Sequence, residues 1–286
     1  MLISLVNRSG RHSDEKVQKV VRAINRQIEE DFTPYWSFGA RVRLEGAVGK
    51  RPDAQSLADM RGDAVIYLWD KVNLKDALGY HDTNFRGIPY GFVFTDLSEN
   101  LGEAWTVTLS HEVLELLGDS QANLLVQGPH PLKPRHTVFH WFEMCDAVQD
   151  ETYAIDGIEV SNFVLPSYFT EGEQEGARND FLGRVHKKGA LKSFGINPGG
   201  YVGFYDPALK DNDQVSIPAD KRALKRLAVK AAAGSGRGRA RRVTLGQSGG
   251  VQAIAQLGSS ISPRQKSKLR TASQHLILKV GKVSKS

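Results

Sequence analysis

Cysteine, long apolar runs and acidic residues near the carboxyl end are scarce in this chain of 286 residues. The single cysteine, Cys145, excludes an internal disulfide and points to no oxidising compartment, so we expect the reducing cytoplasm. No apolar run approaches the length of a membrane span, and the apolar residues 2–6 are too few, and lack the basic flank, for a signal peptide. These absences favour a globular protein with a sizeable core.

Acidic residues are almost missing from residues 219–286, which contain 16 Lys or Arg residues and one acid. Residues 1–218 contain 22 basic and 31 acidic residues, so their formal net charge is −9 while that of the tail is +15. We therefore expect a folded domain over residues 1–218, followed by a basic helix and a flexible Gly- and Arg-rich tail over residues 219–286. Such a tail predicts binding to nucleic acid or another polyanion. The expected contacts are Arg237, Arg239, Arg241 and Arg242.

Apolar periodicity in the domain predicts an α+β fold. Strands are predicted at residues 2–6, 40–45, 64–69 and 87–95, and helices at residues 13–31 and 101–117. Proline and glycine within residues 87–95 favour an edge strand. Residues 153–160 predict a hairpin, because Asp156-Gly157 accommodates the positive φ angles of a type I′ turn.

Residues 110–119 combine an imidazole and carboxylates at helical spacing. His111 and Glu115 are four residues apart, so on a helix they share a face and can bind one cation, while Glu112 leans toward a water held by that cation. An alternative interpretation needs no metal. The leucines and valine of residues 109–117 form an apolar stripe, and a core helix that ends at Gly118 explains them equally well.

The segment resembles the active-site helix of zincin metallopeptidases, His-Glu-x-x-His, with Glu115 in place of the second histidine. The order of predicted elements over residues 1–120 also resembles their amino-terminal half. The resemblance implies a zincin-like domain with a twisted mixed sheet, whose edge strand lies over the cleft and pairs with substrate. It also implies a metal-dependent peptide or amide hydrolase, in which Glu112 activates a metal-bound water. We expect one Zn²⁺, with Mn²⁺, Fe²⁺ or Ca²⁺ as alternatives because Glu115 makes the site more anionic.

The resemblance further implies a third ligand from downstream. Glu143 is the first choice, because it lies in the apolar residues 138–148, where a buried carboxylate needs a partner or a cation. Asp146 would support the ligands or replace one of them, and Asp119 is a further alternative.

Aromatic and imidazole side chains downstream allow two interpretations. Tyr153 or Tyr168 could donate to a developing oxyanion, as tyrosines do in some zincins, or could be core residues with a satisfied hydroxyl. The remaining histidines are interpreted as residues hydrogen-bonded to backbone, with His140 as the best additional ligand. They are His81, His130, His136 and His140.

A second function class stays open at this stage. The chain could be a non-catalytic structural or binding protein, with a degenerate zincin-like domain and a polyanion-binding tail. Metal content and the coordinating side chains separate this alternative from the hydrolase.

Overall fold

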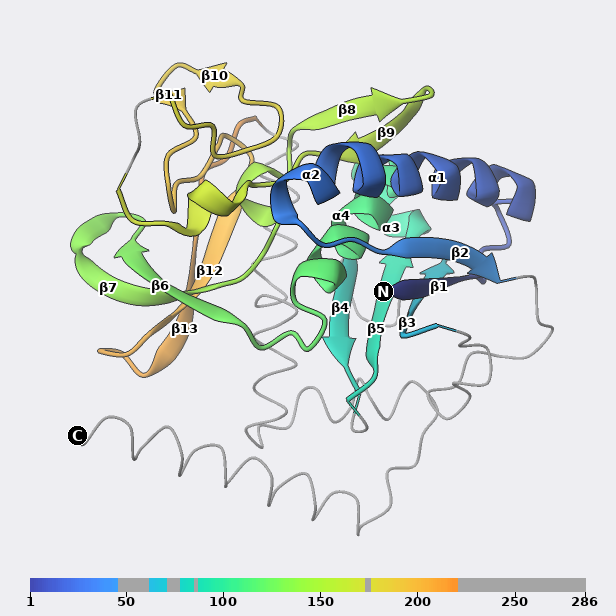
Figure 1. Ribbon diagram of the computed structural model, residues 1–286, viewed down its shortest axis with the longest axis horizontal. Coiled ribbons are helices and arrows are strands. Elements are labelled where there is room, and N and C mark those ends of the chain that lie inside the picture. Colours follow the sequence, from blue (N-terminus) through green and yellow to red (C-terminus); the bar gives the residue numbers. More distant parts are fainter. Residues whose placement is uncertain (46–61, 71–77, 85–86, 173–175, 221–286) are drawn as a thin grey trace, which may run out of the picture.

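The computed structural model describes residues 1–45, 62–70, 78–84, 87–172 and 176–220. The predicted tail contacts Arg237, Arg239, Arg241 and Arg242 therefore lie outside the described residues, as does nearly all of the tail. The described part is a mixed α+β structure with several sheets and few helices (Figure 1).

A five-stranded mixed sheet forms the amino-terminal half. In spatial order its strands are β2 (Arg41–Glu45), β1 (Leu2–Asn7), β3 (Ala64–Trp69), β5 (Pro89–Phe94) and β4 (Gly79–Thr83). All neighbouring strands are parallel except β4, which pairs antiparallel with β5. The predicted strands at residues 2–6, 40–45 and 64–69 are thus confirmed.

The edge-strand prediction for residues 87–95 is wrong, because β5 has a neighbour on each side, and β4 is the edge among the described strands. Proline is tolerated in an inner strand here because Pro89 is its first residue. Gly91 allows close packing, since a Cβ there would lie 3.1 Å from the Tyr80 carbonyl oxygen.

Two helices pack on one face of this sheet and enclose the main core. The long helix α1 (Asp14–Arg26) starts at the predicted cap, where the Ser13 side chain accepts from the Lys16 amide. It continues through the π-helical η1 (Gln27–Phe32) into α2 (Thr33–Trp36). The second helix, α4 (Trp105–Gly118), follows the short α3 (Thr95–Asn100), so the helix predicted at residues 101–117 begins four residues later than expected.

Smaller sheets make up the second half of the domain. An antiparallel sheet has the order β13 (Asp211–Ser216), β12 (Tyr201–Asp206), β7 (Lys133–Trp141) and β6 (Leu125–His130). The short elements are β8 (Thr152–Ile155), β9 (Ile158–Ser161), β10 (Val185–His186), β11 (Gly189–Ala190), η3 (Asp146–Val148) and η4 (Pro166–Phe169).

The hairpin predicted at residues 153–160 is confirmed as β8 and β9, with positive φ at both Asp156 and Gly157. This hairpin packs on α4, which is thus buried between the sheet and the second half of the domain (Figure 1). Among the described residues, no helix is both long and apolar enough to cross a membrane.

Candidate metal centre

Helix α4 carries its polar residues inside the core. His111, Glu112 and Glu115 are each no more than 6% exposed. The apolar side of the helix packs into the main core, where Leu109, Val113 and Leu116 are fully buried. On the side of the hairpin, the Ser161 amide donates to Ser110 Oγ at 2.7 Å. Because both sides of the helix are packed, its carboxylates cannot reach bulk water, and they must be stabilised within the protein.

The predicted pair on α4 converges. His111 Nε2 lies 3.2 Å from Glu115 Oε1, as the four-residue spacing requires. The same nitrogen lies 3.2 Å from Asp146 Oδ1, which arrives from η3. Three side chains from two distant segments therefore meet around one imidazole nitrogen.

Both downstream acids reach this cluster. Ligand atoms of Glu143, Asp146 and Glu115 lie within 4.8 Å of one another. The direct contact to His111 comes from Asp146, whereas the sequence favours Glu143 as the third ligand. The chain between β7 and η3 is irregular, with a bend at residues 144–145, so helical spacing does not describe how Glu143 and Asp146 are arranged.

Cys145 lies next to His111 and Glu115. Its backbone amide donates to Glu115 Oε1 at 3.3 Å, and its thiol group joins His111 and Glu115 in a third possible ligand set. Burial, followed by the negative charge of Glu115, raises the pKa of the Cys145 thiol well above its usual value.

His81, on the edge strand β4, is the histidine whose interpretation was wrong. Its Nδ1 lies 3.3 Å from Glu112 Oε2 and 3.8 Å from Glu115 Oε2. Gly79 on the same strand permits this approach, since a Cβ there would lie 2.8 Å from both Glu112 Cγ and Oε1. No sequence signal placed His81 at the motif, because the pairing of β4 with β5 decides it.

His140 and His130 have the backbone partners expected of them, whereas His136 contacts an aspartate side chain. His140 Nε2 lies 2.8 Å from the Pro129 carbonyl oxygen and His136 Nε2 lies 2.9 Å from Asp206 Oδ2. The Leu132 amide donates to His130 Nδ1 at 3.0 Å.

Tyr201, the first residue of β12, is a site residue that the sequence did not reveal. Its hydroxyl donates to Asp146, and burial together with the charges of Asp146 and Glu115 raises its pKa well above the usual value. The turn before it brings it there, because the Asn197 amide donates to the Ala147 carbonyl at 3.0 Å. Gly200 packs so closely on that same carbonyl that a Cβ could not be placed. Tyr201 thus remains a neutral hydroxyl donor beside the acids.

The two tyrosines named from the sequence have structural partners. The Tyr153 hydroxyl donates to Asp31 Oδ2 at 2.7 Å, next to the end of the long helix. The Tyr168 hydroxyl donates to the Gly195 carbonyl at 2.8 Å. Both contacts agree with the alternative that these are core residues with a satisfied hydroxyl.

Asp119, the alternative third ligand, closes the turn after α4. Its carboxylate accepts from the amides of Asn123 and Leu124 at 3.0 and 2.9 Å. Gly118 before it packs on Met144, whose side chain occupies the space that a Cβ would need. The structure therefore assigns Asp119 a role in turning the chain.

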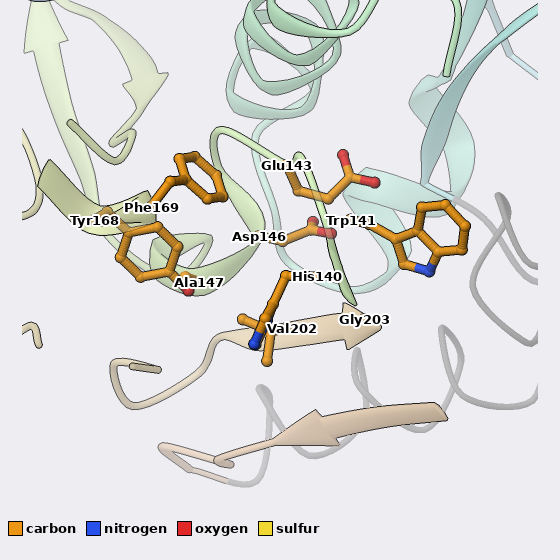
Figure 2. A pocket seen from close by; sticks show the side chains of 9 residues that line it. All are labelled: His140, Trp141, Glu143, Asp146, Ala147, Tyr168, Phe169, Val202 and Gly203. Atoms are coloured by element: carbon orange, nitrogen blue, oxygen red, sulfur yellow. The ribbon is translucent and has the colours of Figure 1, made fainter. Parts of the chain in front are cut away.

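A pocket adjoins the downstream acids. Figure 2 shows the carboxylates of Glu143 and Asp146 between the rings of Phe169 and Trp141. Tyr168, Val202 and Gly203 complete much of the remaining wall. The acids thus have both a buried side, toward α4, and a side that borders this pocket.

Buried His, Glu and Cys side chains consequently form groups that could bind a metal ion. Comparison of the chain with models of protein families, with curated proteins and with solved structures gave no match. The case for function accordingly depends on the geometry of the site.

Proposed function

We propose that this protein is a metal-dependent hydrolase of peptide or amide bonds. The observation that carries the proposal is the position of His111 Nε2, 3.2 Å from both Glu115 Oε1 and Asp146 Oδ1 in the protein interior. Several carboxylates are buried at this place, and buried acids are costly unless they are paired or bind a cation.

The donor set fits a divalent transition metal. One imidazole nitrogen and two carboxylate oxygens are the ligand types of catalytic Zn²⁺ sites, which keep a further position open. Mn²⁺ and Fe²⁺ accept the same donors, whereas Ca²⁺ prefers six to eight oxygens. We therefore propose Zn²⁺ as the resident ion, held by His111, Glu115 and Asp146, with Glu143 beside them.

The side chains around these ligands have roles that suit hydrolysis. A divalent ion bound here would act as a Lewis acid toward water and a substrate carbonyl. Glu112 adjoins His111 in the sequence, and its Oε2 lies 3.3 Å from His81 Nδ1, which orients it as the general base. Tyr201 offers a neutral hydroxyl next to Asp146.

The neighbourhood of α4 favours a peptide as the substrate. Strand β4 contacts α4 and is the last strand of the sheet within the described part of the chain. An extended peptide can add to such an edge through backbone hydrogen bonds. An edge strand beside the helix that carries the acids is also what the resemblance to zincins implies.

Metal analysis of the purified full-length protein tests the proposal. We expect about one tightly held ion per chain, lost in His111→Ala and Asp146→Asn, because each removes a ligand. His136→Ala and Asp119→Asn are the matched controls, since their side chains bind Asp206 and the turn after α4, and both should keep the ion. If the natively folded protein binds no divalent ion, the proposal of a metal-dependent hydrolase is wrong.

The alternative function is a binding protein, and the charge of residues 219–286 favours it. Replacing the four arginines of residues 237–242 with alanine should weaken salt-sensitive DNA binding and leave peptide cleavage unchanged. An ion-loaded protein that cleaves no member of a peptide library, yet binds DNA through these arginines, would establish this alternative.

A further inference from the structure

We propose a second divalent-cation position formed by His81, Glu112 and Glu115, adjacent to the first, with Glu115 as the carboxylate that bridges both ions. This inference builds on the proposed function, which supplies the first ion at His111, Glu115 and Asp146. It turns a site for one ion into a site for two.

The two oxygens of Glu115 face two different imidazoles. Oε1 lies 3.2 Å from His111 Nε2, and Oε2 lies 3.8 Å from His81 Nδ1. The ligand set of His111, Glu115 and Cys145 and the set of His81, Glu112 and Glu115 share only Glu115. A carboxylate that presents one oxygen to each side is how two-metal hydrolases hold ions about 3.5–4 Å apart.

The second set comes from a separate element of the fold. His81 is on β4, is 2% exposed, and points its Nδ1 at Glu112 Oε2 on α4. Ligand atoms of His81, Glu112 and Glu115 all lie within 4.8 Å of one another. One imidazole nitrogen with two carboxylate oxygens suits Mn²⁺, Fe²⁺ or Zn²⁺.

The charge of the cluster matches two ions. Glu112, Glu115, Glu143 and Asp146 are all buried, and fully ionised they carry four negative charges. A single divalent ion would neutralise half of this charge, whereas two would neutralise all of it. When the second position is filled, Glu112 Oε2 is a metal ligand. Glu112 therefore acts as the general base only in the state with one ion.

A simpler arrangement makes a different prediction. His81 Nδ1–H could donate to Glu112 and serve only to orient it, and the protein would then bind one ion. Counting ions while measuring their magnetic coupling separates the two cases, because only ions a few ångströms apart couple.

The test is titration of the full-length, metal-free protein with Mn²⁺, followed by equilibrium dialysis and electron paramagnetic resonance. We expect two Mn²⁺ per chain and a spin-coupled signal at saturation. His81→Ala should bind one Mn²⁺ with an uncoupled signal, and Glu112→Gln should behave in the same way, which guards against a fold defect in either variant. His136→Ala, the matched imidazole control, should keep both ions and the coupling.

The remaining outcomes overturn the inference in distinguishable ways. One ion at saturation, two ions without coupling, or a coupled pair in His81→Ala would each remove the second position. The proposed function would survive the first result if that ion is lost in His111→Ala. No bound Mn²⁺ in the folded wild-type protein would remove both proposals.

Discussion

Two groups of buried carboxylates in this domain have different neighbours. The first group consists of Glu151 and Asp180, and we call it the structural group. Glu151 Oε1 accepts from His186 Nε2 and Asn197 Nδ2 at 2.6 and 2.8 Å. Asn162 Nδ2 donates to both Glu151 Oε2 and Asp180 Oδ2, each at 2.8 Å. Nitrogen donors from three segments thus surround these acids.

The group around α4 has donors too, in the Cys145 amide and the Tyr201 hydroxyl, but it also brings acids together with one another. Oxygens of Glu115, Glu143 and Asp146 lie within 4.8 Å of one another, and imidazoles approach from two sides. Neutral donors satisfy a carboxylate without a cation, whereas acids that face each other are stable together when a cation lies between them. Burial alone therefore does not single out a candidate metal site, and the close approach of acids and imidazoles does.

The largest expected effect is on kcat, and it distinguishes the proposed base, Glu112, from the proposed metal ligands. Glu112→Gln should lower kcat on a peptide substrate by about 10²–10⁴-fold, because it removes the proton acceptor, and it should retain the first ion. Metal content and single-turnover rates on the same preparation check this. Glu151→Gln, in the structural group, should leave both readouts unchanged, and a Glu112→Gln enzyme as fast as its parent would exclude Glu112 as the base.

A second variant breaks the structural group. Asn162→Leu should lower the free energy of unfolding by about 3 kcal/mol, because it takes a donor from two buried carboxylates. Urea unfolding measures this change, and metal analysis should still find the ion. Asn123→Leu, at an exposed position, should stay within about 0.5 kcal/mol. Equal stability of the two variants would mean that the donors around Glu151 contribute little.

A substitution in strand β4 should have a smaller effect on kcat, through the position of Glu112 on α4. Gly79→Ala should lower kcat by about tenfold, because the added methyl group displaces Glu112 from its position against the strand. Gly10→Ala is the control, since its Cβ meets only Asp70 Oδ2 at 3.4 Å. Unchanged kcat in Gly79→Ala would show that the position of Glu112 tolerates this shift.

The smallest expected effect is on the free energy of unfolding, and its sign differs between the two groups of carboxylates. In metal-free protein, Glu143→Gln should raise the free energy of unfolding by about 1 kcal/mol, because it removes repulsion between neighbouring carboxylates. Glu151→Gln should lower it by about 2 kcal/mol, because it replaces an acceptor of charge-assisted hydrogen bonds. Urea unfolding with and without chelator measures both. If Glu143→Gln lowers the free energy of unfolding in the presence of chelator, the proposed repulsion between Glu143 and its neighbouring carboxylates is wrong.

Local patterns predicted the elements that depend on near neighbours. The cap at Ser13, the continuous apolar strand β3 and the Asp156-Gly157 turn each depend on a few consecutive residues, and all are as expected. Strand β5 was misplaced at the edge because sheet order depends on a partner, β4, that carries no distinctive pattern.

The convergence of His111 and Glu115 follows from the sequence, because helical geometry places residues four apart on one face. Only the tertiary structure decided which other groups complete the site. Asp146 arrives through a turn, Tyr201 through a glycine that packs on the Ala147 carbonyl, and His81 through the pairing of β4 with β5. Local spacing has one geometric solution, whereas contacts between distant segments depend on the packing of the entire domain, which no short pattern encodes.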